Sequence, residues 1–193
     1  MFYEILGIAS GVIFIICDIP YLIDTIVAKT KPHRVSWGVA FLLNLIGLAN
    51  QFASGAKNSL WIFVASVLMT GLIFLASLKN GVGGHTKQDI YTIIACLSGV
   101  ALWGLFNSPV FSIVINVFIA IFALIPSFAK ARRAPETETK IAWTGGTVSA
   151  FLATISVGEL NWKLLILPTV SVILQGYMVY ILYIGAYKFK QKT

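Results

Sequence analysis

Long apolar runs alternate with short polar stretches along the whole chain. An α-helix needs about 20 mainly apolar residues to cross about 30 Å of hydrocarbon, and most of the runs reach that length. The pattern predicts seven membrane-spanning helices, of which the fourth and the sixth are short. Their predicted bounds are 4–27, 36–54, 60–78, 90–106, 109–129, 141–157 and 163–187.

Composition supports the membrane assignment independently of the pattern. Of the 193 residues, 58% are hydrophobic and 11% are charged, and the mean hydropathy is +0.88. Such a chain has too few polar side chains to cover a water-soluble globule of this length. The first residues lack the basic start of a signal peptide, so we expect the first helix to be retained. The sequence therefore predicts an all-α polytopic membrane protein.

Basic residues gather on one side of the predicted membrane. With seven spans, that side receives the first elbow (residues 28–35), the loop at 79–89, the second elbow (residues 130–140) and the C-terminus. Twelve of the fourteen Lys and Arg residues lie there, and Lys57 and Lys163 lie on the other side. The positive-inside rule then predicts an outer N-terminus and a cytosolic C-terminus. The net charge of +7 is explained by this topology and by contact with anionic lipids, so no nucleic-acid partner is expected.

A spacing of proline and tryptophan occurs twice. Pro20 is followed by Trp37 after 17 residues, and Pro126 is followed by Trp143 after the same interval, 106 residues further along. Each proline lies near the end of a predicted helix, and each tryptophan opens the next helix after a basic elbow. We interpret this as an internal duplication of a three-helix unit.

Three spans reverse the direction of the chain, so two copies in the same orientation need one additional span between them. The fourth predicted helix supplies it, which gives a 3+1+3 architecture of parallel repeats, a plan used by transporters. The expected division is residues 1–79 for the first repeat, 80–108 for the linker with the fourth helix, and 109–193 for the second repeat with a short basic tail.

These residues resemble a known superfamily. A proline near the end of the first helix, a short basic loop and a second helix, repeated around a linker helix, is similar to the SWEET and PQ-loop superfamily of seven-helix membrane proteins. The segments KTKPHRVSW and PETET…W resemble most closely an uncharacterised prokaryotic group, which implies a prokaryotic plasma membrane. The superfamily's Pro-Gln pair appears as Pro20-Tyr21 and Pro126-Ser127, so the prolines match and the glutamines do not. The resemblance implies transport of sugars, amino acids or vitamin-like compounds, or a receptor role.

The two repeated prolines are candidate hinges. Proline has no N–H, so Pro20 and Pro126 leave the carbonyls of Ile16 and Phe122 without helical partners, and the helices can bend there. Matching bends near the cytosolic ends suit an inner gate. A static kink relieved by local packing is the alternative.

Polar side chains inside the predicted spans are candidates for a solute pathway, because each is costly unless it faces protein or water. Asp18 is the only acid well inside a span, and Asn44 is expected at a similar depth on the second helix. A carboxylate there suits proton coupling, and a structural hydrogen bond to Asn44 or to a freed carbonyl beside the proline kink is the alternative. By resemblance to SWEET-like carriers, Gln175 is the preferred amide contact. The remaining candidates are Asn50, Gln51 and Asn116, the first two with an interfacial alternative.

The elbows hold a second group of candidates. Trp37 and Trp143 are expected either to anchor at the membrane edges or to line a vestibule. Under the internal symmetry, acids of the second elbow stand opposite cations of the first, which predicts a cytosolic latch between the halves. The four residues of this latch are His33, Arg34, Glu136 and Glu138.

Several other chemistries are not expected. Cys17 and Cys96 lie in separate spans as packing residues, and His33 and His85 have no Cys or His at ligand spacing, so neither a metal nor a cofactor is implied. No catalytic motif is present, so an enzyme is not expected. The segment GIASG (residues 7–11) predicts close helix packing within the chain, with a homo-oligomer as the alternative.

Two functions remain: a carrier for a small polar solute, and a membrane receptor or sensor on the same scaffold. The short loops favour the carrier.

Overall fold

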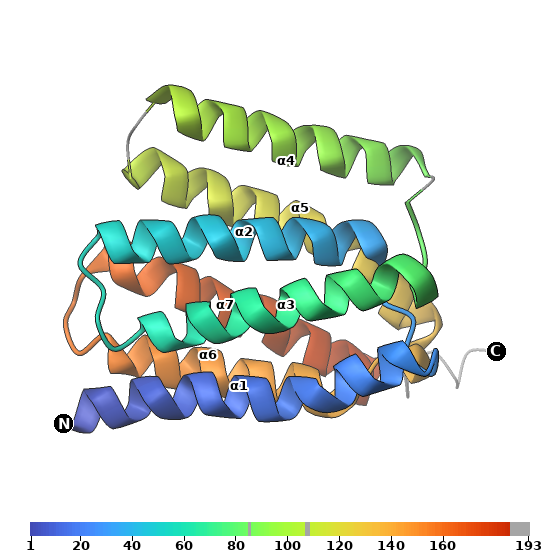
Figure 1. Cartoon of the computed structure of the whole chain (residues 1–193), viewed down its shortest axis with the longest axis horizontal. Helices are drawn as coiled ribbons and strands as arrows, with labels where there is room; N and C mark the ends of the chain where they lie inside the picture. Colours follow the sequence, from blue (N-terminus) through green and yellow to red (C-terminus); the bar gives the residue numbers. More distant parts are fainter. Residues whose placement is uncertain (85, 107–108, 186–193) are drawn as a thin grey trace.

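A computed structural model of the chain describes residues 1–84, 86–106 and 109–185 (Figure 1). His85 and the lysines of the expected basic tail lie outside the described residues. The described part contains seven α-helices and two short helical segments. The helices are α1 (Phe2–Ile26), α2 (Arg34–Ala53), α3 (Leu60–Asn80), α4 (Lys87–Phe106), α5 (Pro109–Arg133), α6 (Lys140–Ser156) and α7 (Trp162–Tyr180), with a 3₁₀ turn η1 (Pro135–Thr137) and a π-helical segment η2 (Ile181–Gly185).

The seven predicted helices correspond to these seven elements. Most bounds differ by at most three residues. The α5 helix continues to Arg133, where the cations of its last turn interact favourably with the helix C-terminus. The α7 helix ends at Tyr180, where the span predicted to reach residue 187 continues as η2. Five helices, α1, α2, α3, α5 and α7, are long and apolar enough to cross a membrane. The α6 helix has 17 residues. The chain is therefore a helical membrane protein with five to seven membrane-spanning helices.

Side chains of α1 are distributed as lipid requires. Ile8, Val12 and Ile16 lie at intervals of four residues and are 41%, 49% and 60% exposed. On the other face of the same helix, Ser10 and Asp18 are buried. An apolar exterior around polar buried positions is the arrangement expected of a helix between lipid and protein.

The helices run side by side along the long axis of the molecule, so the loops gather at its two ends (Figure 1). Within the first part of the chain, α3 packs against both α1 and α2. Within the last part, α7 packs against both α5 and α6. The two parts meet where α1 packs along α6 and where α2 packs along α5. The α4 helix lies at the edge of the bundle and packs mainly on α5.

Close helix approach in the first part depends on GIASG. A Cβ atom on Gly7 would lie 2.2 Å from the carbonyl oxygen of Asn58, and one on Gly11 would lie 2.9 Å from that of Trp61. The N-terminal half of α1 therefore rests directly on the backbone at the start of α3, which confirms the expected packing within the chain.

Two buried clusters fill the bundle between α1, α3, α6 and α7. One contains Phe14, Phe63 and Leu167, and the other contains Tyr21 and Trp143 at the elbow end. All five side chains also line a common cavity, which therefore lies between the two clusters. The fold positions this cavity at the junction of its two parts.

Candidate functional site

The cavity between the two parts of the bundle has a volume of about 160 Å³. That is space for on the order of ten water-sized groups, enough for a small organic molecule. Side chains of α1, α2, α3, α5, α6 and α7 line it. Four of the polar residues expected along the solute pathway are among them: Asp18, Asn44, Asn116 and Gln175.

Asp18 is the charged group of this cavity. It is 4% exposed, and no donor among the described residues makes a hydrogen bond or ion pair with its carboxylate. Asn44 lines the same cavity but donates its Nδ2 to the carbonyl of Ala40, one turn back on its own helix, over 2.9 Å. The structural alternative, in which Asn44 holds Asp18, is therefore not what the geometry shows. Burying a carboxylate without a partner is costly, so this position is poised for a proton or a ligand.

The cavity amides are oriented by backbone carbonyls. Asn116 donates its Nδ2 to Leu43 over 3.0 Å, as Asn44 does to Ala40. Gln175 is half-buried and lies against α6 at Gly146, where a Cβ would come within 1.8 Å of its Oε1. The absence of a side chain at Gly146 thus makes the space that the Gln175 amide occupies.

Asn50 and Gln51 are buried but do not line the cavity. Asn50 donates to Ser112 over 2.6 Å and so connects α2 to α5. Gln51 donates its Nε2 to the carbonyls of Lys163 and Leu164 in α7. Pro168, four residues after Leu164, has no N–H to bond that carbonyl, and the amide of Gln51 takes its place. Both residues therefore tie helices together inside the protein, and their place along the solute pathway stays a prediction.

The repeated tryptophans lie inside the protein. Trp37 and Trp143 are 9% and 8% exposed, line the cavity, and have their ring centres 6.2 Å apart. Tyr21 packs on Trp37 with a centre-to-centre distance of 4.9 Å. For these two tryptophans the vestibule alternative fits and the membrane-edge alternative does not.

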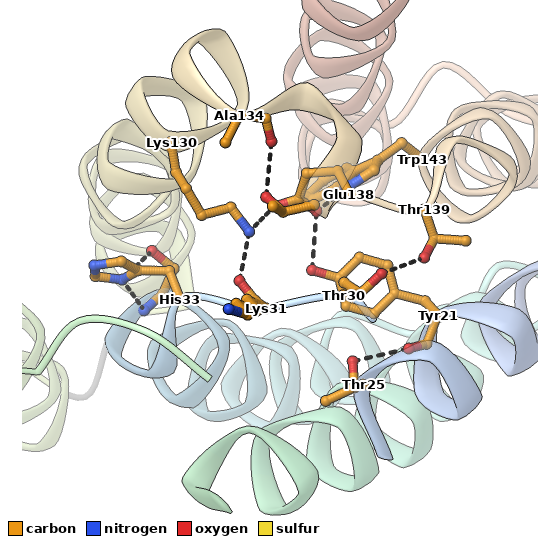
Figure 2. A network of polar contacts seen from close by, with 12 residues as sticks. Tyr21, Thr25, Thr30, Lys31, His33, Lys130, Ala134, Glu138, Thr139 and Trp143 are labelled. Atoms are coloured by element: carbon orange, nitrogen blue, oxygen red, sulfur yellow. Dashed lines mark hydrogen bonds and ion pairs between the residues drawn. The ribbon is translucent and has the colours of Figure 1, made fainter. Parts of the chain in front are cut away.

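Beside this aromatic group, Glu138 of the second elbow contacts three other residues (Figure 2). Its Oε2 accepts hydrogen bonds from Tyr21 Oη over 2.9 Å and from Trp143 Nε1 over 3.0 Å, and its Oε1 forms an ion pair with Lys130. Lys130 also donates to the carbonyl of Lys31 in the first elbow over 2.6 Å. We call Tyr21, Lys31, Lys130, Glu138 and Trp143 the elbow latch, because it ties α1 and the first elbow to α5 and α6.

The latch forms between the two elbows, but most of its expected members are elsewhere. Among the described residues, Glu136 is exposed and has no hydrogen bond or ion pair. Arg34 instead donates to the carbonyls of Ser77 and Gly83. Of the four expected residues, Glu138 alone takes part, because η1 turns its side chain inward under α1 while Glu136 points to the outside.

His33 has a different partner from the one expected. Its Nδ1 accepts a hydrogen bond from the N–H of Ser36 at the start of α2, and its Nε2 lies 3.2 Å from Asp89 Oδ1 in α4. Burial lowers the pKa of His33 below its usual value, although the nearby Asp89 carboxylate acts in the opposite direction. The imidazole is therefore neutral near pH 7, and the contact joins the first elbow to the start of the fourth helix.

Pro20 and Pro126 lie inside continuous helices, α1 and α5, close to the ends that carry the elbows. The residue after Pro20 is Tyr21 of the elbow latch, and the residue after Pro126 is Ser127, which lines the cavity. Their role as hinges stays a prediction, and the structure positions both prolines where a bend would move the latch.

Sequence reasoning missed the residues that act through pairing across the fold. Tyr21 contacts Glu138, Lys130 contacts the carbonyl of Lys31, and Asp89 contacts His33. The two residues of each pair are far apart in the chain. Tyr21 carried one usable signal, since a tyrosine hydroxyl inside an apolar helix needs a partner.

The resulting site can enclose a small molecule beside a single carboxylate and close it off with the elbow latch. Comparisons with protein-family models, with curated proteins and with solved structures found no match to this chain.

Proposed function

We propose that the protein is a membrane carrier for a small polar solute, which works by alternating access between two three-helix repeats. The observation that carries the proposal is the cavity at the junction of the two parts, with the unpartnered Asp18 carboxylate on its wall. Ligand sites are typically mostly apolar cavities with a few convergent polar groups, which describes this one.

Helix packing supports the repeat within this proposal. The third helix of each part, α3 or α7, packs against the first and second helices of that part. In the repeat, α1 corresponds to α5 and α2 corresponds to α6. Exchanging the two repeats therefore turns the contact of α1 with α6 into the contact of α5 with α2, and both contacts are present. That relation is expected of a two-fold pseudo-symmetric carrier. It supports the division into residues 1–79, 80–108 and 109–193 and the resemblance to the SWEET and PQ-loop superfamily.

The elbow latch is suited to be the inner gate. It closes the end of the cavity at Tyr21 and Trp143, and the basic elbows place that end in the cytosol under the positive-inside rule. Opening the cavity to the cytosol requires Glu138 to separate from Tyr21. Pro20 and Pro126, which directly precede Tyr21 and Ser127, are the positions where α1 and α5 can bend to achieve this.

Proton coupling through Asp18 is part of the proposal. A carboxylate in an apolar cavity is stabilised by a proton or by a bound cation. Movement of the cavity from one face to the other would then carry whichever of the two is bound, the proton or the cation. A pH gradient across proteoliposomes should therefore drive accumulation of the solute, and the Asp18→Asn protein should not accumulate it.

A solute panel tests the carrier function. Sugars, amino acids, vitamin-like compounds and organic amines are screened with purified protein by thermal stabilisation, and those that bind are tested for uptake into proteoliposomes with and without a pH gradient. Binding followed by saturable uptake supports the carrier. Binding without uptake favours the receptor or sensor. A panel with neither binding nor uptake contradicts both.

A further inference from the structure

The walls of the cavity carry one carboxylic acid among the described residues. Among the described residues that line it, Asp18 is ionisable as an acid, and there is no Lys, Arg or His. Twelve of the fourteen cations of the chain lie in the elbows, the loop at 79–89 and the tail. An anion in the cavity would therefore find no compensating cation, and Asp18 in its ionised form would repel it.

Several lining donors are used inside the protein, while the hydroxyls of Ser66, Ser127 and Ser171 and the amide of Gln175 have no hydrogen bond among the described residues. Ser36 donates to the carbonyl of Ala123, Thr70 donates to that of Ser66, and Tyr21 donates to Glu138.

Two amides of the cavity leave their acceptor atoms free. Since a carbonyl can only accept, the bonds from Asn44 to Ala40 and from Asn116 to Leu43 fix Nδ2 as the bonded atom of each amide. The Oδ1 atoms of both are left without a hydrogen bond among the described residues, like the carboxylate of Asp18. These three acceptor groups suit a ligand that brings donors.

The rest of the wall is aromatic and aliphatic. Trp37, Trp143, Tyr21 and Phe14 line the same cavity as Asp18, and the two indole rings lie close together. Indole faces attract cations, and they also cover apolar carbon atoms. A hydrated inorganic ion gains little from such a wall, whereas an organic cation uses all of it.

We propose that the cavity selects small organic monocations, in which one ammonium group is attached to an apolar or aromatic body, and rejects zwitterions and anions. This inference rests on the proposed carrier function and names its substrate class. The ammonium pairs with the carboxylate of Asp18, the amide oxygens of Asn44 and Asn116 accept its remaining hydrogens, and the body packs on Trp37 and Trp143. An amino acid has the ammonium but also brings a carboxylate, for which the cavity offers no cation.

The test is a series of probes with one shape and different charge. The probes are 2-phenylethylamine, 2-phenylethanol, phenylalanine and 3-phenylpropanoate, and binding to the purified full-length protein is measured by tryptophan fluorescence and thermal shift at constant ionic strength. We expect the amine to bind about 10- to 100-fold more tightly than the alcohol, the range that a charge-assisted hydrogen bond supplies. Phenylalanine and the propanoate should bind more weakly than the alcohol.

A pair of variants assigns the preference to one residue. In Asp18→Asn the amine should bind no more tightly than the alcohol. Asp24→Asn is the matched control, the same change on the same helix at an acid that is paired with Lys29 outside the cavity, and it should keep the preference. The comparison of amine with alcohol in the unmodified protein needs no variant, so the proposal stays testable if Asp18→Asn does not fold.

The outcomes separate the two proposals. An alcohol or a zwitterion that binds as tightly as the amine overturns the inference on the substrate class, and saturable uptake of that compound leaves the carrier function standing. An amine preference that survives in Asp18→Asn also overturns it. If neither the probes nor the wider solute panel bind or cross, the carrier function fails and the inference fails with it.

Discussion

Tyr21 donates a hydrogen bond from its hydroxyl to Glu138 Oε2 over 2.9 Å, and this bond joins α1 to the second elbow. Asp18 lies three residues earlier on the same face of α1, and both side chains line the cavity. One helix face therefore carries both the charge that a solute would meet and the hydroxyl that holds the elbow latch. A ligand that shifts this face of α1 acts on the latch directly.

Loss of the Tyr21 hydroxyl is expected to loosen the latch. Tyr21→Phe removes the bond to Glu138 and keeps the ring that packs on Trp37, so the cavity should open more often at the elbow end. Ser127 lines the cavity one turn before Lys130 and is 2% exposed. A thiol introduced there by Ser127→Cys reports opening through its rate of labelling with a hydrophilic maleimide.

The measurement is made in a background in which Cys17 and Cys96 are replaced by serine. Tyr3→Phe is the control, since it makes the same change on the same helix at an exposed position. We expect faster labelling in Tyr21→Phe than in Tyr3→Phe. Equal rates would show that the hydroxyl does not hold the cavity closed.

Two acids of the second elbow should differ strongly in their effect on stability. Glu138→Gln leaves the ammonium of Lys130, whose side chain is 14% exposed, without its counter-charge, and is expected to cost about 3 kcal/mol of unfolding free energy. Glu136→Gln changes an exposed side chain and should stay within about 0.5 kcal/mol. Thermal unfolding in detergent compares them. Adding Lys130→Met to Glu138→Gln should recover part of the loss, and strict additivity would argue against the ion pair.

Contact between α1 and α6 depends on the lack of a side chain at Gly145. A Cβ there would lie 2.2 Å from the Cβ of Cys17, so Gly145→Ala must push the two helices apart and is expected to destabilise the protein by about 1–3 kcal/mol. Gly176→Ala is the control, because its Cβ would meet Thr147 at an ordinary 3.7 Å. Thermal unfolding should show a loss for Gly145→Ala that Gly176→Ala does not share.

The neighbouring glycine should separate binding from folding. A Cβ on Gly146 meets only the end of the Gln175 side chain, which can rotate away. Gly146→Ala is therefore expected to fold with a smaller loss of stability than Gly145→Ala and to bind cavity ligands with altered affinity. An unchanged affinity would mean that Gln175 does not contact the ligand.

The protein should lose stability as the pH falls, through His33. Burial lowers the pKa of this imidazole in the folded protein, so between the folded and unfolded values the unfolded chain binds more protons. The contribution of His33 is complete above the unfolded value of about 6.5 and declines as the pH falls below it. His33→Asn keeps an acceptor at the start of α2 but cannot titrate in this range.

Thermal unfolding at about pH 7.5 and about pH 5.5 measures this effect, because the two values bracket the unfolded pKa of histidine. The unmodified protein should lose more stability on acidification than His33→Asn does. His85→Asn accounts for the other histidine of the chain. Identical losses in the unmodified protein and in His33→Asn would show that His33 is not responsible.

The sequence alone determined the helices and the inventory of polar groups inside them. Run length, prolines and basic loops were enough to predict all seven helices, because crossing a bilayer requires a fixed length of apolar chain. The cost of burying polar groups was enough to select Asp18, Asn44, Asn116 and Gln175, and the structure places all four around one cavity.

Only the tertiary structure decided which face of each helix is turned inward and which partners meet there. In a membrane helix the lipid side and the protein side are both apolar, so hydrophobic periodicity does not reveal the rotation of the helix about its axis. In the second elbow, Glu136 and Glu138 likewise look alike in the sequence, yet only Glu138 reaches Tyr21 and Lys130, because the turn of η1 decides which side chain points inward. The same packing turned Asn50 and Gln51 into ties between helices, because their donors were taken by Ser112 and by carbonyls of α7.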